Sequence, residues 1–574
     1  MTKRKPEQRL TRPDNSDRLP QGIDKHEMSH VEEVHTNNTT SPEKNSDVEA
    51  NDDQTKMTTK RMMSLVAMAF LWTGSQIPVY LFGGVPPYIY GDIGGTDRWV
   101  WFVLANLLSL AAVCPFVGSI SDLIGRRWVA LIGAGFLVLG MIICSTVHDM
   151  NYFICGMVFA GVGAGINELT ALAATSELAP TSKRGAYVAV LIFTIVPFVP
   201  SVMYGQLIAY YSSWRWLGLI CGLWAFIGLV FVAIFYFPPP RVNSEGLSRK
   251  EVLHQIDYIG GFLSVGGMLL FMMGMQWGGY QYDWDSAHVL APLILGAAML
   301  IGFVVWEGYA PYPMFPRRLR QEPRTMGLLL VITAISGANF FSILMFWPTQ
   351  AFNVYGHDPV GVGLRGFPVG FGIMGGAVIV LVLLSVFRGH NKELMIISSV
   401  MMTAGCGSLA VAKVDNMGTL WGLLTLAGLG IGGIVVPASI ITTIICPDDL
   451  IATVAALTLA IRVIGGSIGY CVYYNVFVSK FVPKAMLNIT NETIIGEAIK
   501  LTADSLVDRI AELPGVAGVP GAHEGIVYAG QVAYAEAYVY VYLVSIAFGS
   551  VSIVAACFLG DISKYMDDHV AVVM

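Results

Sequence analysis

From about residue 61 to near its C-terminus the chain alternates long apolar runs with short polar segments. A run of about 20 apolar residues can cross a bilayer as an α-helix, and in lipid it satisfies its backbone hydrogen bonds better as a helix than as a strand. The pattern predicts an all-α membrane protein. About fourteen spans are expected at 62–89, 99–119, 128–148, 151–175, 185–211, 215–237, 257–278, 287–308, 326–355, 360–387, 393–413, 417–445, 451–479 and 533–559.

A Gly-rich apolar segment occurs twice in this pattern. Residues 160–180 read AGVGAGINELTALAATSELAP, and residues 427–447 read AGLGIGGIVVPASIITTIICP. The copies align without a gap and share their small residues, but Glu168 of the first falls on Val435 of the second. A repeat of this kind predicts two related helical halves. The copies fall on the fourth and twelfth spans, which are eight spans apart. Equivalent positions in two adjacent halves of six would be six spans apart, so we expect two inserted spans, the seventh and eighth, in a 6 + 2 + 6 arrangement.

This arrangement divides the chain into four parts. Residues 1–60 are polar and nearly free of aromatic residues, and we expect a disordered cytoplasmic tail. Residues 61–237 form the expected N-terminal six-helix half, and 238–323 the two-helix insertion with flanking cytoplasmic loops. Residues 324–574 form the C-terminal six-helix half, with 480–532 as a long extracytoplasmic loop.

Composition agrees with a membrane protein. The chain is 55% hydrophobic and only 13% charged, whereas a soluble protein carries about 25% charged residues. Its net charge of −6 says little, because most charges lie in the tail and loops. Lys and Arg gather in alternate loops, such as Arg126 and Arg127 after the second span. The positive-inside rule therefore predicts that both termini are cytoplasmic.

The long loop carries two glycosylation sequons, at Asn488 and Asn491. Their use requires that the loop be extracytoplasmic, and sequons also arise by chance. Within this loop, residues 496–513 have apolar positions at helical spacing, which predicts a short surface helix.

The loop after the second span reads GSISDLIGRR. It resembles the signature loop of the major facilitator superfamily, although Leu123 stands where an Arg is usual. A small residue permits close helix approach, a glycine permits a tight turn, and an Asp can pair with a base or a helix N-terminus. We interpret the loop as a cytoplasmic gate rather than an ordinary basic loop. Its gating residues are Gly118, Asp122, Gly125, Arg126 and Arg127.

At a closer level the chain resembles the fungal trichothecene efflux pump family, a fourteen-helix branch of that superfamily. The resemblance rests on long stretches that include GINELTALAATSELAPTSKRG, IVPFVPSVMYGQLIA and SGANFFSILMFWPTQAFNVYGHDP, and it covers most of residues 70–480. It implies proton-driven transport of amphipathic small molecules, but it does not fix the substrate, and the neighbouring fourteen-helix siderophore transporters work in the opposite direction. The fifth-span antiporter signature is degenerate, and Pro197 and Pro200 predict a kink there.

Ionisable groups inside the spans are few and costly, so each suggests function or pairing. Glu168 lies about 17 residues into its span, roughly 25 Å along the helix, and we expect it to bind and release the coupled proton. Arg462, in the middle of the thirteenth span, is the second candidate for proton coupling or substrate contact, and it needs an acceptor. Glu168, a helix C-terminus and an anionic substrate would each serve, and purely structural roles remain open for both residues.

The substrate cavity is expected on the first and fourth helices of each half, as the superfamily resemblance implies. A mostly apolar pocket with few polar anchors suits an amphipathic ligand. The candidates are Trp72, Gln76, Tyr80, Asn167, Asn339, Phe340, Trp347 and Gln350.

Other chemistry is absent from the sequence. No Walker A loop occurs, and the Gly-rich repeats lie within apolar helices, where glycines serve helix packing. No metal cluster or catalytic triad is present, so we expect no enzyme activity, cofactor or metal. The expected partners are a small-molecule substrate, protons and the lipid bilayer, without ATP or nucleic acid. The leading interpretation is a plasma-membrane exporter, with the vacuolar membrane, siderophore-iron uptake and a non-transporting receptor as alternatives.

Overall fold

The computed structural model describes residues 59–95, 98, 100–238, 251, 254, 256–279, 282–315, 322–488, 501, 510, 513, 516 and 521–566. Nearly all of the expected tail, most of the expected helix 496–513 and Asn491 lie outside these residues. So do the side chains of Asp122 and Asn488, although both lie in helices. Residues 57–574 cluster into one compact unit.

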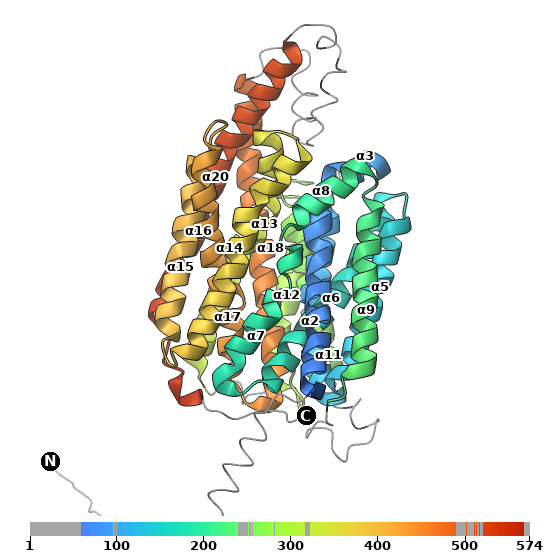
Figure 1. Ribbon diagram of the computed structural model, residues 1–574, viewed down its shortest axis with the longest axis vertical. Coiled ribbons are helices and arrows are strands. Elements are labelled where there is room, and N and C mark those ends of the chain that lie inside the picture. The colour runs from blue at the N-terminus through green and yellow to red at the C-terminus, as the bar shows by residue number, and fades with distance from the viewer. Residues whose placement is uncertain are drawn as a thin grey trace, which may run out of the picture. The chain divides into compact units, whose positions relative to one another are not determined.

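The described residues form helices and no strand, which confirms the all-α fold (Figure 1). Thirteen segments of the described chain are long and apolar enough to cross a membrane. They are formed by α2 (Thr59–Gly83), α4 (Val100–Ile124), α5 (Arg126–Thr146), α6 (Met150–Leu178), α9 (Arg215–Phe235), α11 (Tyr258–Trp277), α12 (Ala287–Tyr309), α13 (Pro323–Tyr355), α14 (Pro359–Val386), α15 (Asn391–Ser408), α16 (Met417–Val435) continued by α17 (Pro437–Ile445), α18 (Ile451–Asn488) and α20 (Ala522–Cys557).

The fifth expected span is broken, which explains why thirteen such segments are found instead of fourteen. It consists of α7 (Arg184–Phe193), a 3₁₀ turn, and α8 (Ser201–Tyr211). Pro197 lies in the turn and Pro200 is the N-cap of α8. A proline has no N–H for the helical hydrogen bond and clashes with the preceding turn, so the expected kink is a full interruption.

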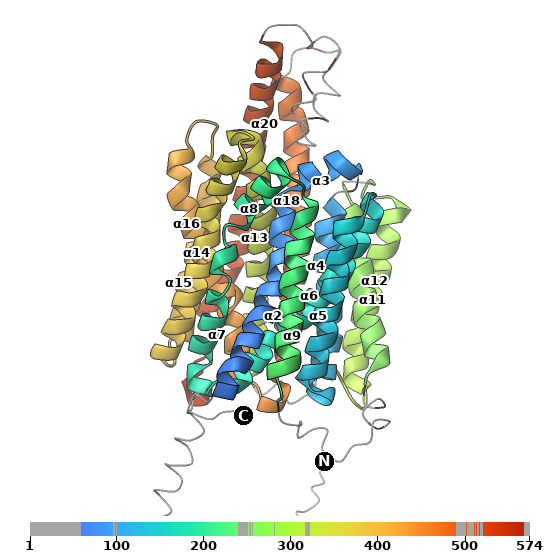
Figure 2. The ribbon, with the colours of Figure 1, turned by 45° about the vertical axis from the view of Figure 1, so that its right-hand side comes forward.

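The last two long helices extend well beyond their expected limits. α18 continues to Asn488 and α20 begins at Ala522, so the two ends of the expected loop 480–532 are helical. At 1.5 Å per residue, 38 and 36 residues span about 57 and 54 Å, against about 30 Å of bilayer hydrocarbon. Both helices rise above their neighbours (Figure 2). Apolar length marks where a helix can cross lipid, but helical hydrogen bonding continues into polar sequence.

Each half is a tight bundle, and the two bundles meet along a few helices. In the N-terminal half α6 packs on α4 and α5, and α9 packs on α2 and α5. In the C-terminal half α16 packs on α14 and α15, and α13, α18 and α20 pack on one another. The halves meet where α4 and α6 pack on α18 and where α7 and α8 pack on α14. The α11–α12 hairpin contacts both halves through α11, which packs on α4 and α18.

Repeated glycines lie at close contacts between helices inside each half. A Cβ on Gly161 of α6 would lie 2.2 Å from the Asn106 carbonyl oxygen of α4. A Cβ on Gly432 of α16 would lie 1.8 Å from the Ile373 carbonyl oxygen of α14. Because α4 and α14 are the second helices of their respective halves, the repeat forms the same helix pair twice.

Two names are used below for the ends of the bundle. The basic end carries Arg126, Arg127 and Arg184. The opposite end carries α3 (Pro86–Ile93) and the extensions of α18 and α20.

Candidate functional site

Arg184 joins the two halves at the basic end. Its side chain is 1% exposed and donates to the Ser176 carbonyl oxygen of its own half at 3.0 Å. It also donates to the Thr443 carbonyl oxygen and the Asp448 carboxylate of the other half, each at 2.8 Å. One buried guanidinium therefore holds the ends of α6 and α17 together.

The signature loop lies at the same end. A Cβ on Gly118 would lie 2.7 Å from the Ala456 Cβ of α18, so the two halves approach each other closely at this glycine. Gly125 has a φ of 99°, a left-handed conformation that a glycine adopts without strain. Both glycines therefore have the local geometry on which the gate interpretation depends.

The loop's two arginines make their described contacts within the N-terminal half. Arg126 is buried and forms an ion pair with Glu177 of α6. Arg127 donates to the Ala233 carbonyl oxygen at 3.0 Å and lies 3.7 Å from the ring centre of Phe237. The gating role of Gly118, Gly125 and these arginines stays a prediction, as does that of Asp122.

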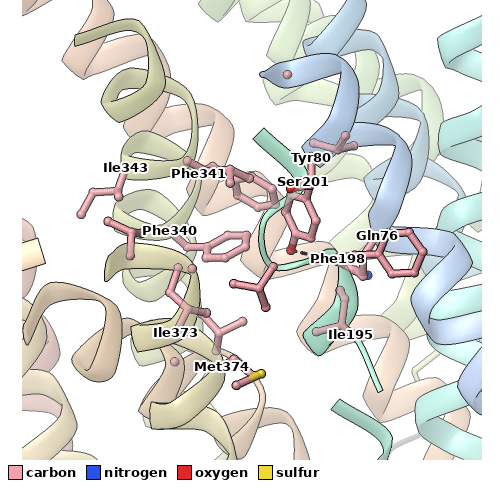
Figure 3. Close-up of a pocket in the computed structure, with 18 of the residues that line it drawn as sticks. Gln76, Tyr80, Ile195, Phe198, Ser201, Phe340, Phe341, Ile343, Ile373 and Met374 are labelled. Carbon is pink, nitrogen blue, oxygen red and sulfur yellow. Dashed lines mark hydrogen bonds between the residues drawn. The ribbon is translucent and has the colours of Figure 1, made fainter. Parts of the chain in front are cut away.

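A central cavity lies between the halves, above this closed end. Its empty volume is about 1460 Å³, which includes solvent space at its opening. Helices α2, α4, α6, α7 and α8 line it from the N-terminal half, and α13, α14, α16 and α18 from the C-terminal half. Figure 3 shows Gln76, Tyr80 and Phe198 on one side and Phe340, Ile373 and Met374 on the other.

Glu168 and Arg462 are the charged side chains among the described residues that line this cavity. Arg462 Nη2 donates to Glu168 Oε1 at 2.5 Å, and the two side chains are 8% and 3% exposed. Glu168 is ten residues from the end of α6 and Arg462 is eleven from the start of α18, so both lie roughly 15 Å from the basic end. The pair connects the two halves inside the cavity.

Five of the eight candidate substrate residues line the cavity. They are Trp72, Gln76, Tyr80, Phe340 and Trp347. The Tyr80 hydroxyl donates to Gln76 Oε1 at 3.3 Å, and Gln76 Nε2 donates to the Ser75 hydroxyl at 3.1 Å. This short polar chain on α2 faces a largely apolar wall, as an amphipathic ligand would require.

The other three candidates lie away from the cavity lining. Asn167 is 1% exposed and faces α5, where a Cβ on Gly133 would lie 2.6 Å from its Oδ1. Asn339 accepts a hydrogen bond from the Tyr473 hydroxyl at 2.9 Å. Gln350 accepts one from the Tyr542 hydroxyl. They were chosen because they are polar residues within a span. Whether such a residue faces the cavity or another helix depends on how the helices pack.

Two parts of the site were not singled out from the sequence. The broken fifth crossing supplies Ile192, Ile195 and Phe198 to the cavity wall, and Arg184 with Asp448 joins the halves. Arg184 follows Pro180 by four residues and Asp448 follows Pro447 by one. Those prolines end the two repeat copies, so the repeat itself was a usable signal for the contact. Among the described residues no group of three His, Cys, Asp or Glu side chains could hold a metal ion.

The sequence profile of the fungal trichothecene efflux pump family (TRI12) matches residues 60–574. The chain belongs to the fungal trichothecene efflux pump family. One relative is the trichothecene efflux pump TRI12 of Fusarium sporotrichioides, 25% identical over 84% of this chain and 83% of that protein. Another is the efflux transporter ffsH of Aspergillus flavipes, 26% identical over 78% of each chain. These relatives are major facilitator superfamily transporters, a group without enzymatic members.

Solved structures agree with this family at the level of the fold. A bacterial homologue of the human lysosomal transporter Spinster, in an inward-facing conformation, matches with a TM-score of 0.56 and 13% identity over 88% of this chain and 98% of that chain. The proton:xylose symporter XylE matches with a TM-score of 0.52 and 13% identity over 88% and 96%. The trichothecene efflux pump family member described here therefore has the major facilitator superfamily fold, and the 6 + 2 + 6 arrangement is consistent with it.

Proposed function

We propose that this protein exports amphipathic small molecules through the central cavity in exchange for protons. The observation that carries the proposal is the Glu168–Arg462 pair, a buried ionic contact between the two halves on the wall of a mostly apolar cavity. A single protonation event there changes both the contact between the halves and the polarity of the cavity. These are the two properties that an exchange cycle has to couple.

A carboxyl group can exchange a proton for a substrate, because protonation changes both its charge and its hydrogen bonding. When Glu168 is ionised it accepts hydrogen bonds, both from Arg462 and from a hydroxyl group of the substrate. When it is protonated it loses its charge and becomes a donor at one oxygen, so the ion pair and the substrate contact weaken together. The proton and the substrate thus compete for one carboxyl group, which is the requirement for antiport.

The direction of transport follows from the proposed orientation. By the positive-inside rule the basic end faces the cytoplasm, and both termini lie there. In this conformation Arg184 holds the basic end closed, below the cavity. Protonation from an acidic exterior then releases substrate away from the cytoplasm. A plasma membrane fits this scheme, and so does a vacuolar membrane, whose lumen is also acidic.

Transport by purified protein in liposomes tests the proposal. A panel of amphipathic toxins, beginning with a trichothecene because of the relatives' substrate, is offered with and without a pH gradient. The wild type should accumulate at least one compound in proportion to the gradient. Glu168→Gln should still exchange substrate but lose all dependence on the gradient, because the amide cannot bind the coupled proton.

Glu307→Gln is the matched control. Glu307 also lies in a long apolar helix, α12, but it accepts the backbone N–H groups of Met314 and Phe315 at 3.0 Å and is absent from the cavity lining. It should keep the gradient dependence of the wild type. Unchanged coupling in Glu168→Gln would refute the proposed proton site. Uptake of a ferric siderophore complex into cells, with no toxin efflux, would refute the exporter.

A further inference from the structure

A second cavity lies beside the central one, toward the opposite end. Its empty volume is about 1380 Å³, and it is enclosed mainly by α4, α13, α18 and α20. Six aromatic rings from α18 and α20 dominate its wall. These rings define what we call the aromatic cavity: Tyr470, Tyr474, Phe477, Phe481, Tyr534 and Tyr538.

The spacing of these rings would by itself suggest an ordinary helix seam. Residues spaced three and four apart share one helical face, and the rings do contact one another. The ring centres of Phe477 and Phe481 are 5.4 Å apart, and those of Phe481 and Tyr534 are 4.6 Å apart. A closed seam would leave no space beside it. Here Val103 and Leu107 of α4 form the facing wall across the cavity, so the rings border open space.

The aromatic cavity differs chemically from the central one. No charged side chain occurs among the described residues that line it, whereas Glu168 and Arg462 line the central cavity. Its polar groups are hydroxyls, and that of Ser467 stands out. Ser467 is 1% exposed, lines the cavity and has no hydrogen-bond partner for its hydroxyl among the described residues. A buried hydroxyl without a partner is costly, and a ligand oxygen would remove that cost.

We propose that the aromatic cavity is a second ligand site, which binds a neutral aromatic molecule carrying a hydrogen-bond acceptor such as a ketone. The rings supply faces and edges for stacking, the lack of charge selects an uncharged ligand, and Ser467 donates to the acceptor. A lipid acyl chain would bury apolar surface against the rings but would leave the Ser467 hydroxyl without an acceptor. Binding at this site does not require transport, so the inference stands independently of the proton-exchange proposal.

The location of the site gives it a further property. The two cavities adjoin, because four residues line both of them: Gly83, Leu107, Phe341 and Met345. The α4 wall belongs to the N-terminal half and the α13, α18 and α20 walls to the C-terminal half. Movement of the halves relative to each other therefore changes the width of the aromatic cavity.

Photolabelling of the full chain in lipid nanodiscs tests this site, with benzophenone as the probe. Benzophenone is neutral, carries two rings and one ketone, and reacts with nearby C–H bonds on illumination. We expect saturable labelling of peptides that cover residues 470–481 and 534–538. Non-saturable labelling, or labelling confined to the α2 and α6 peptides of the central cavity, would overturn the proposal. A co-purified lipid that occupies the site and is not displaced by benzophenone would overturn it as well.

Two sets of variants sharpen the test. The double variant Tyr474→Leu, Tyr538→Leu should weaken benzophenone binding by about tenfold, since each aromatic contact contributes a few-fold. Tyr540→Leu is the matched control, because Tyr540 lies on the same helix but is 40% exposed and absent from the lining. Equal loss in the double variant and the control would contradict the assignment.

Ser467→Ala keeps the test valid if the double variant fails to fold. It removes one hydroxyl oxygen and should weaken benzophenone binding about fivefold, which is the loss of affinity expected when one hydrogen bond is removed. Diphenylmethane, which has the same rings but no ketone, should bind both proteins equally. Equal weakening of both compounds would show that Ser467 does not donate to the ligand and would overturn its role.

Discussion

Removing Arg184 should open the basic end. Its hydrogen bond to the Thr443 carbonyl oxygen, 2.8 Å long, comes from a guanidinium that is 1% exposed, and a bond of this type contributes about 1.5–3 kcal/mol. Its ion pair with Asp448 is weaker, because the Asp448 side chain is 36% exposed; a partly solvated pair contributes about 0.2–1 kcal/mol. Together they favour the closed basic end by about 2–4 kcal/mol.

That energy corresponds to a large shift in population. At about 1.4 kcal/mol per factor of ten, Arg184→Gln should raise the open-to-closed ratio at the basic end by about 30- to 700-fold. Asp448→Asn should raise it by no more than about fivefold, since it removes the exposed charge and keeps an acceptor oxygen. The order of the two effects follows from burial alone.

Thiol labelling measures the opening. Ala456 is buried against Gly118 where the halves meet, so a cysteine introduced by Ala456→Cys reacts only when they separate. The exposed Cys155 and Cys557 are first replaced. Lys183→Gln is the matched control, because Lys183 is the neighbouring basic residue at the same end but its side chain is exposed. Labelling of Arg184→Gln at the wild-type rate, or equal acceleration in the control, would refute the reasoning.

Two further predictions concern stability. The hydrogen bond from Arg215 and, to a smaller extent, that from Trp214 hold the pKa of Asp92 below its usual value of 3.8, so this pair stabilises the fold above pH about 4 and the contribution is lost as the pH falls through the lowered pKa. Because both side chains are partly exposed, Asp92→Asn should lower stability by less than about 1 kcal/mol at pH 7, and the difference in thermal unfolding between variant and wild type should shrink as the pH falls below about 4; a difference that stays constant across this range would contradict the pairing. Gly432→Ala places a Cβ 1.8 Å from the Ile373 carbonyl oxygen and should cost about 1–3 kcal/mol, whereas Gly422→Ala on the same helix meets nothing within 4 Å; equal melting temperatures of the two variants would refute the close packing assigned to the repeat.

Much of the architecture could be predicted because it depends on local pattern. Apolar runs of sufficient length predict spans in any lipid environment, and the two Gly-rich copies indicated two halves before any contact was known. The break in the fifth crossing was signalled by Pro197 and Pro200, whose effect on a helix is intrinsic to the residue. Prediction failed at the ends of α18 and α20. There the apolar pattern ends at the expected membrane surface, but the helices continue into polar sequence.

The candidate site was only partly accessible in this way. Glu168 and Arg462 each stood out as a charge in an apolar run, but their 2.5 Å contact joins positions 294 residues apart. Asn167, Asn339 and Gln350 were as polar as Gln76, yet they pack against other helices of their own half, and no periodicity reveals which neighbour a helical face will meet.

The sequence alone determined the membrane-spanning helices, the duplication and the family, because these depend on composition and on order along the chain. Tertiary structure decided which side chains share a cavity. It brought Arg184 to Thr443 and Asp448 at the basic end, and it left the aromatic faces of α18 and α20 beside open space. The physical reason is that burial and pairing are properties of two surfaces in contact, and a single chain segment specifies only one of them.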